Sequence, residues 1–219
     1  MNSLINSAVP WRFPARCWRL GAAGLSLALL CSCAALAPAV APHPRFFSLA
    51  DARGAAHAAP QTGTAAAGFD SPHIVYVRQA SQLEYYAHNE WVDTPARMLA
   101  PLIVSAIEQG GAFRAVVQTP STAAGDMRLD TEVLRLQHEF LGKPSRVRFS
   151  LRAYLVDSVT RRVLASREFE AVAAAPSEDA YGGVMAANEA VRSVLNGLAA
   201  FAATAASSWT RGAAEAVQR

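Results

Sequence analysis

Two histidines with a nearby carboxylate are the residues of this sequence whose types and spacing could support acid–base or metal chemistry. His88 lies two residues before Glu90, and His138 directly precedes Glu139. Neither pair belongs to an H-E-x-x-H zinc helix or accompanies a G-x-S-x-G nucleophile turn or a glycine-rich phosphate loop. We therefore expect both histidines on the surface, and we predict no catalytic site, no metal site and no bound cofactor.

Three aromatic side chains, Tyr85, Tyr86 and Trp91, cluster just before a predicted helix. Exposed aromatic side chains often anchor interfaces, because they bury a large area while losing few rotamers. Contact with a partner protein or a lipid is one interpretation, and a core flap over the helix is the other. Because neighbouring side chains of a strand point to opposite faces, we expect one of Tyr85 and Tyr86 in the core and the other exposed.

One cysteine lies in a context that predicts covalent attachment of lipid. In Leu30-Cys31-Ser32-Cys33, an aliphatic, a variable and a small residue precede Cys33, as in a bacterial lipobox. Taking Cys31 as the acceptor would put the bulky Leu30 at the small position. Cys33 is therefore the predicted acceptor of acyl chains such as palmitate, and Cys31 is the alternative. Two or three chains give a stable anchor, whereas a single myristoyl chain binds only marginally.

The residues before Cys33 are organised like a secretory signal. Residues 1–19 carry three arginines and no acid, and residues 20–30 are uncharged and apolar. An apolar stretch of this length cannot cross a hydrocarbon layer, which needs about 20 residues in helical form. We therefore predict a cleaved lipoprotein signal at 1–32 rather than a permanent transmembrane helix.

Removal of this signal changes the charge balance of the chain. The whole sequence has 20 Lys and Arg against 17 Asp and Glu, and subtracting the three signal arginines leaves 17 basic residues. A neutral mature chain gives no indication of nucleic-acid binding. Only Cys33 of the three cysteines would remain, which excludes an intrachain disulfide and a cysteine-based metal site.

The mature chain is predicted to carry one α+β domain. Residues 33–44 contain the lipidated cysteine and an Ala/Pro spacer that holds the domain off the membrane. Residues 45–206 form the domain, and residues 207–219 are expected to fray. Within the domain, residues 50–72 are rich in Ala, Gly, Thr and Pro and are predicted to form a mobile loop.

Apolar periodicity predicts the order β-β-β-α-β-β-β-β-α, with two main helices packed on one face of a mostly antiparallel sheet. Asp93-Thr94-Pro95 begins the first helix and Gly110-Gly111 ends it. The last helix begins after a cap at Ser177 and buries an apolar stripe that starts at Tyr181. The predicted strands are residues 45–49, 73–77, 83–87, 112–118, 127–140, 146–156 and 162–172.

In two of these strands the residue pattern also predicts which side chains are buried and where the pairing is irregular. The strand at 146–156 alternates apolar and polar residues, so one face is buried and the other is solvated. In the strand before it, the apolar phase slips at Val133–Leu134, which predicts a bulge. We expect the outward arginines of 146–156 to pair across the hairpin with acids of the next strand, Arg148 and Arg152 with Glu168 and Glu170.

Three segments resemble the ABC-type transport auxiliary lipoprotein family. The first is YYAHNEWVDTPARMLAPLIVSAIEQGGAFRAVV at 85–117, with an aromatic pair, a Trp and a Pro-Ala-Arg-Met-Leu helix. The others are LVDSVTRRVLASREF at 155–169 and AANEAV at 186–191. The resemblance covers about Arg45 to Ala202. The sequence departs from the family pattern at Phe201, where a Trp is expected, and in the long loop at 50–72.

This resemblance implies a helper role without catalysis. Members of the family accompany an ABC permease, an ATPase and a mammalian-cell-entry-type substrate-binding protein in Gram-negative bacteria. Such systems are thought to move phospholipids or other hydrophobic molecules between the inner and outer membranes. The resemblance therefore implies a lipid-anchored protein of the outer membrane that faces the periplasm. Ala34, which follows Cys33 in place of an Asp, fits sorting to the outer membrane.

Two other functions remain open on the sequence. The chain could be a periplasmic lipoprotein that itself binds an apolar ligand, which lipid bound to the soluble domain would reveal. An envelope hydrolase is the other class, but the sequence offers no nucleophile and base that can be named as a pair. The oligomeric state is not indicated by any sequence feature.

Overall fold

A computed structural model describes residues 43–49, 63–118 and 125–217, with side chains through residue 209. The predicted signal and both candidate acceptors, Cys31 and Cys33, lie outside these ranges. Within them, no helix has the length and apolar character needed to cross a membrane.

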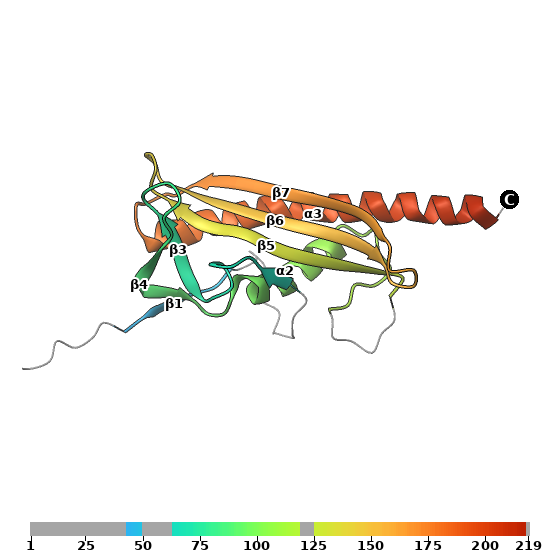
Figure 1. Ribbon diagram of the computed structural model, residues 1–219, viewed down its shortest axis with the longest axis horizontal. Coiled ribbons are helices and arrows are strands. Elements are labelled where there is room, and N and C mark those ends of the chain that lie inside the picture. Colours follow the sequence, from blue (N-terminus) through green and yellow to red (C-terminus); the bar gives the residue numbers. More distant parts are fainter. Residues whose placement is uncertain (1–42, 50–62, 119–124, 218–219) are drawn as a thin grey trace, which may run out of the picture. The chain divides into compact units, whose positions relative to one another are not determined.

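The described domain has the predicted α+β fold, built from a seven-stranded sheet and two helices (Figure 1). Four strands precede the first helix and three follow it. The elements are β1 (Arg45–Phe47), β2 (Gly63–Ala65), β3 (His73–Val77), β4 (Glu84–Trp91), α2 (Pro95–Gln109), β5 (Met127–Glu139), β6 (Arg146–Asp157), β7 (Val163–Ala174) and α3 (Ala180–Val217).

The sheet is mixed rather than mostly antiparallel. Its order is β1-β4-β3-β5-β6-β7, and β2 also pairs with β5. The pairs β3–β4, β5–β6 and β6–β7 are antiparallel, whereas β1–β4, β2–β5 and β3–β5 are parallel. Parallel strands need a long crossover, and β4 with α2 supplies one between β3 and β5. The sequence prediction missed this crossover because alternation does not reveal which strands pair.

Two predictions about strands are wrong. Residues 112–118 form no strand, because the chain turns at Gly111, which has φ of 64°. Phe113 and Val116 of this segment instead pack as half-buried side chains on the core. Conversely, β2 lies inside the segment 50–72 that was predicted to be a mobile loop, and it pairs with Thr131–Val133 of β5.

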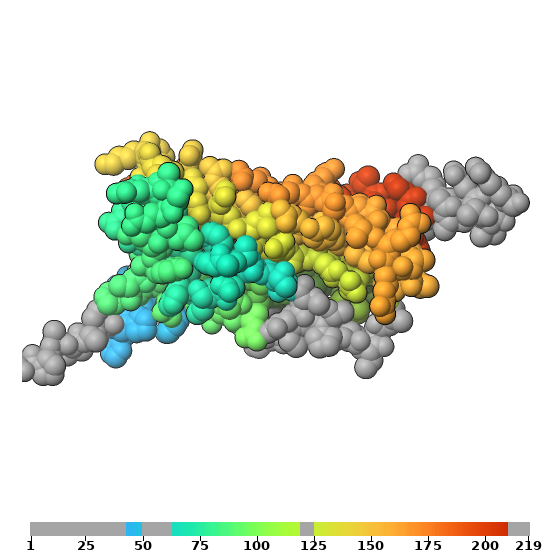
Figure 2. Space-filling model, in the orientation of Figure 1, coloured from blue at the N-terminus to red at the C-terminus, as the bar shows by residue number. Residues whose placement is uncertain are grey.

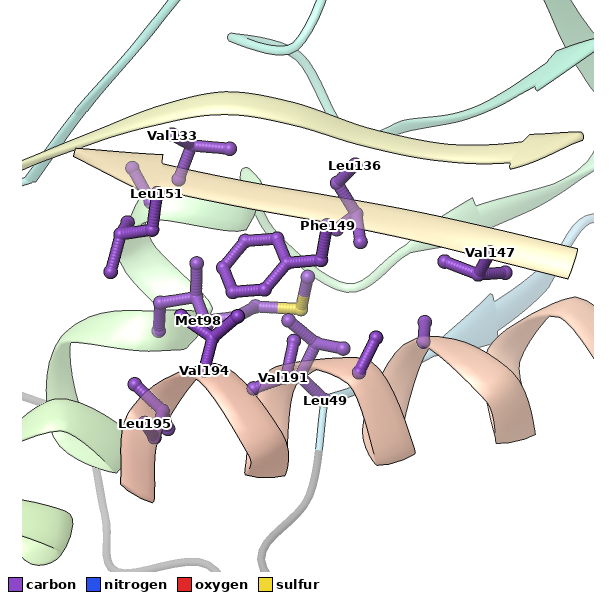
Figure 3. Close-up of a cluster of buried hydrophobic side chains, with 14 of the residues drawn as sticks. Leu49, Met98, Val133, Leu136, Val147, Phe149, Leu151, Val191, Val194 and Leu195 are labelled. Carbon is purple, nitrogen blue, oxygen red and sulfur yellow. The ribbon is translucent and has the colours of Figure 1, made fainter. Parts of the chain in front are cut away.

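The core lies between the sheet and the two helices. Figure 3 shows Phe149 of β6 pointing from the sheet toward Val191 and Val194 of α3 and toward Met98 of α2. The inward residues of β6 predicted from alternation are buried, and Phe149 is completely so. Burying such a side chain contributes about 1.5–3 kcal/mol. Because both helices use this one face, the opposite face of β5, β6 and β7 carries the polar side chains.

The start of α3 differs from its prediction. Asp179, rather than Ser177, accepts a hydrogen bond from the backbone N–H of Gly182, at 2.7 Å, as a helix-capping side chain does. The buried stripe begins at Val184, whereas the predicted first member, Tyr181, is 59% exposed. The helix continues to Val217, beyond residue 207, where fraying was expected.

Candidate functional site

Strand β4 places the three aromatic residues in three different environments. Tyr85 is 46% exposed, Tyr86 is half-buried, and Trp91 is only 3% exposed and belongs to the hydrophobic core. Trp91 therefore occupies the position expected for a core flap beside α2. Of the three residues considered for partner contact, Tyr85 offers an exposed ring.

The ring of Tyr85 lies beside a second exposed ring. His73 of β3 and Tyr85 have ring centroids 5.2 Å apart, and His73 Nδ1 lies 3.6 Å from a carboxylate oxygen of Glu90. Leu83, which is also exposed, lies just before β4 and two residues before Tyr85 in the sequence. We call His73, Leu83, Tyr85 and Glu90 the β4 patch. It combines apolar area with polar groups at its margin, as interfaces do.

Tyr86 points to the other side, into a buried polar chain. Its hydroxyl lies 3.1 Å from Nδ1 of His138, and Nε2 of His138 lies 2.8 Å from Oγ of Ser145. The backbone N–H of Ser145 donates to a carboxylate oxygen of Glu178 at 2.8 Å. This Tyr86–His138–Ser145 chain connects β4 and β5 to residues directly before β6 and α3.

The burial of His138 contradicts the expectation of a surface histidine, which holds only for His88. The reason is the predicted bulge in β5, where the register with β6 shifts between Val133 and Arg135. After the shift, residues 136 and 138 face the helices. Burial lowers the pKa of His138, against the opposing effect of the nearby acids at the start of α3. The lowered pKa favours the neutral form of the imidazole.

The spacing of Ser145 and His138 fits a nucleophile and its base, but their surroundings do not. Ser145 is 0% exposed and His138 is 2% exposed. A Cβ added at Gly183 of α3 would lie 2.5 Å from His138 Nδ1, so the helix packs directly on the ring. A buried hydrogen-bonded network of this kind specifies one packing of the core. We interpret it as a structural connection between strands and helix.

Glu139, the other member of this histidine–acid pair, lies on the opposite face of the sheet. Arg148 donates to its carboxylate at 2.8 Å, and Gln137 does so at 2.9 Å. Burial opposes ionisation, but these hydrogen bonds and that of Arg146 outweigh it and lower the pKa of Glu139. The carboxylate of Glu139 is therefore held in ion pairs with Arg146 and Arg148, and it is not placed to act as a general base.

The predicted cross-strand ion pairs are confirmed on this face. Arg148 contacts Glu170, and Arg152 contacts Glu168 at 3.3 Å. Arg152 also contacts Glu132 of β5 at 3.3 Å, so the arginines of β6 bridge both neighbouring strands. Within the described ranges, no group of three or more His, Cys, Asp or Glu is placed to hold a metal ion.

Comparison with known proteins identifies one family over most of the domain. A family model described as the ABC-type transport auxiliary lipoprotein component matches residues 61–199. No curated protein matches the sequence.

Solved structures share the fold of this domain. Protein XCC0632 from Xanthomonas campestris, which is assigned to family DUF330, has a TM-score of 0.63 and 25% identity, covering 68% of this chain and 85% of its own. An uncharacterised protein has a TM-score of 0.56 and 13% identity, covering 74% of this chain and 97% of its own. The second likeness concerns the fold alone.

Proposed function

Because the chain belongs to the ABC-type transport auxiliary lipoprotein component family, we propose that it is a non-catalytic subunit of an intermembrane transport system in a Gram-negative cell envelope. Acyl chains on Cys33 anchor it to the outer membrane, with the domain in the periplasm. There it docks a mammalian-cell-entry-type substrate-binding protein and, through it, an ABC permease and ATPase. The cargo is a phospholipid or another hydrophobic compound.

The extent of the family match is the observation that carries this proposal. The matched residues, 61–199, run from β2 through about the first half of α3 and so include six of the seven strands, all of α2 and the start of α3. The match therefore concerns most of the packed domain rather than one motif. The absence of catalysis is supported by the burial of Ser145 and His138, the pair with the most suggestive spacing.

We place the docking surface at the β4 patch. Tyr85 can bury its ring against a partner without leaving a hole in the core, because it stands outside the core cluster. Aromatic side chains of this kind are the common energetic centres of interfaces. Trp91 packs β4 onto the hydrophobic core, and the hydroxyl of Tyr86 contacts His138. The exposed ring of Tyr85 therefore lies on a rigid strand.

Capture of the partner tests the proposal. The tagged lipoprotein, solubilised from membranes, is expected to retain the mammalian-cell-entry-type protein, and Tyr85→Ala is expected to reduce the captured amount several-fold. Tyr181→Ala is the matched control, because Tyr181 is also an exposed tyrosine but lies on α3. Failure of the wild-type chain to capture such a protein, together with lipid bound to its acyl-free domain, would indicate a ligand-binding lipoprotein instead.

A further inference from the structure

The first strand of the domain exposes a large apolar side chain. Phe46 of β1 is 59% exposed, and Val92, just after β4, is 56% exposed. Neither side chain belongs to the hydrophobic core or to the β4 patch. They lie at the point where the chain enters the domain.

Strand pairing orients both residues outward. Phe46 pairs with Glu90 and Phe47 with Trp91 in the parallel ladder of β1 and β4, and the N–H of Val92 donates to the carbonyl oxygen of Phe47 at 2.8 Å. Phe47 and Trp91 pack on the core. Because side chains alternate along a strand, Phe46 and Val92 share the opposite, outward side.

The spacer between Cys33 and β1 limits how far this strand can lie from the membrane. Arg45 follows Cys33 by only 12 positions in the sequence. Even a fully extended spacer of that length reaches only about 40–43 Å, so an acyl anchor on Cys33 keeps β1 within that distance of the bilayer surface. Figure 2 shows the segment 43–49 on the surface, at the side of the view opposite to the β6–β7 turn.

The charge beside Phe46 fits the surface of a membrane. His43 and Arg45 are both exposed, and Arg45 directly precedes Phe46 in β1. The acid on the outward side, Glu90, faces His73 at 3.6 Å. A basic residue next to exposed aromatic and aliphatic side chains is the composition of segments that lie in the headgroup region of anionic bilayers.

We propose that Phe46 and Val92 form a membrane-contact surface, which enters the headgroup region of the anchoring bilayer while Arg45 binds lipid phosphate. The proposal rests on the tether in the proposed function. It adds an orientation, with β1 against the membrane and the β6–β7 turn away from it. The acyl chains then attach the protein to the membrane, and β1 determines which side of the domain faces the membrane and which side faces away from it.

Depth-dependent quenching of tryptophan fluorescence tests this surface. The mature, acylated chain is reconstituted in vesicles of phosphatidylethanolamine and phosphatidylglycerol, with and without brominated acyl chains. The Phe46→Trp variant is expected to show additional emission that brominated lipid quenches. Val159→Trp is the matched control in the β6–β7 turn, where Val159 is 87% exposed, and the wild-type chain gives the background of Trp91 and Trp209.

Three results would overturn the contact. The first is quenching of the Phe46→Trp emission no greater than that of Val159→Trp. The second is quenching that persists unchanged when Arg45→Glu and Val92→Ser are added. The third is an emission change that requires a high protein concentration in lipid-free micelles, which would assign the surface to a second copy of the chain.

This test separates the contact from the proposed function. Loss of quenching while the partner is still captured removes the membrane surface alone, and loss of capture while quenching persists removes the docking role alone. Mass spectrometry of residue 33 reports the tether itself. An unacylated Cys33 would overturn both the tether and the orientation built on it.

Discussion

Oγ of Ser145 lies 2.8 Å from Nε2 of His138, and neither side chain reaches solvent. In an enzyme this pair would face a substrate. Here Tyr86 and Gly183 occupy the other side of the imidazole ring. The pair therefore contributes to stability, and its removal has a different signature from the loss of a catalytic group.

Ser145→Ala is expected to destabilise the domain by about 1–3 kcal/mol, because it leaves a buried ring nitrogen without its partner. Urea unfolding measures this loss. Partner capture should be retained wherever the variant is folded. If Ser145→Ala kept its free energy of unfolding but lost partner capture, the Ser145 hydroxyl would have a chemical role instead.

Gly183→Ala is expected to destabilise the domain by about 1–3 kcal/mol or more, because its Cβ would lie 2.5 Å from His138 Nδ1. Gly142→Ala is the control, since a Cβ there meets no atom within 4 Å. Thermal unfolding of both variants gives the comparison. Equal unfolding temperatures would show that α3 does not press on the histidine ring.

Glu139 should make stability depend on pH in the acid range. Its pKa in the folded domain is lowered from the ordinary value of 4.5. Its contribution is therefore fully present above that ordinary value, and it is lost as the pH falls through the lower, folded pKa. Glu139→Gln should flatten the acid limb of the stability profile in urea titrations from pH 7 to pH 3. Glu189→Gln on the surface of α3 is the control, and an equal flattening by it would contradict the assignment.

Trp91 and Tyr85 should separate stability from docking. Trp91→Ala removes a core side chain and is expected to cost about 3–5 kcal/mol of unfolding free energy. Tyr85→Ala should change that free energy by only about 0.5 kcal/mol, while it weakens partner capture. Paired unfolding and capture assays measure both effects. A large stability loss for Tyr85→Ala would place its ring in the core.

Local patterns predicted the elements whose pairing is local. The hairpin of β6 and β7 followed from alternation, and its pairs Arg148–Glu170 and Arg152–Glu168 are present. The bulge at Val133–Leu134 was also visible in the apolar phase of the sequence. Its consequence for His138 could have been foreseen from the same shift, since the residues after the bulge change faces.

Features that depend on distant partners were not predictable in this way. Gly63–Ala65 has little strand propensity and becomes β2 only because it pairs with β5, far along the chain. Residues 112–118 have strand-like composition but no strand to join. Tyr181 fits the helical stripe of α3 but lies exposed. Tertiary context decided each of these cases.

Docking through the β4 patch is tested most directly by a photo-crosslink formed from that patch in intact cells. With a benzophenone amino acid replacing Tyr85, we expect a covalent product that contains a mammalian-cell-entry-type protein, and no such product from the same substitution at Val159. Crosslinking to that protein from Val159 but not from position 85, or from neither position, would contradict docking through the β4 patch.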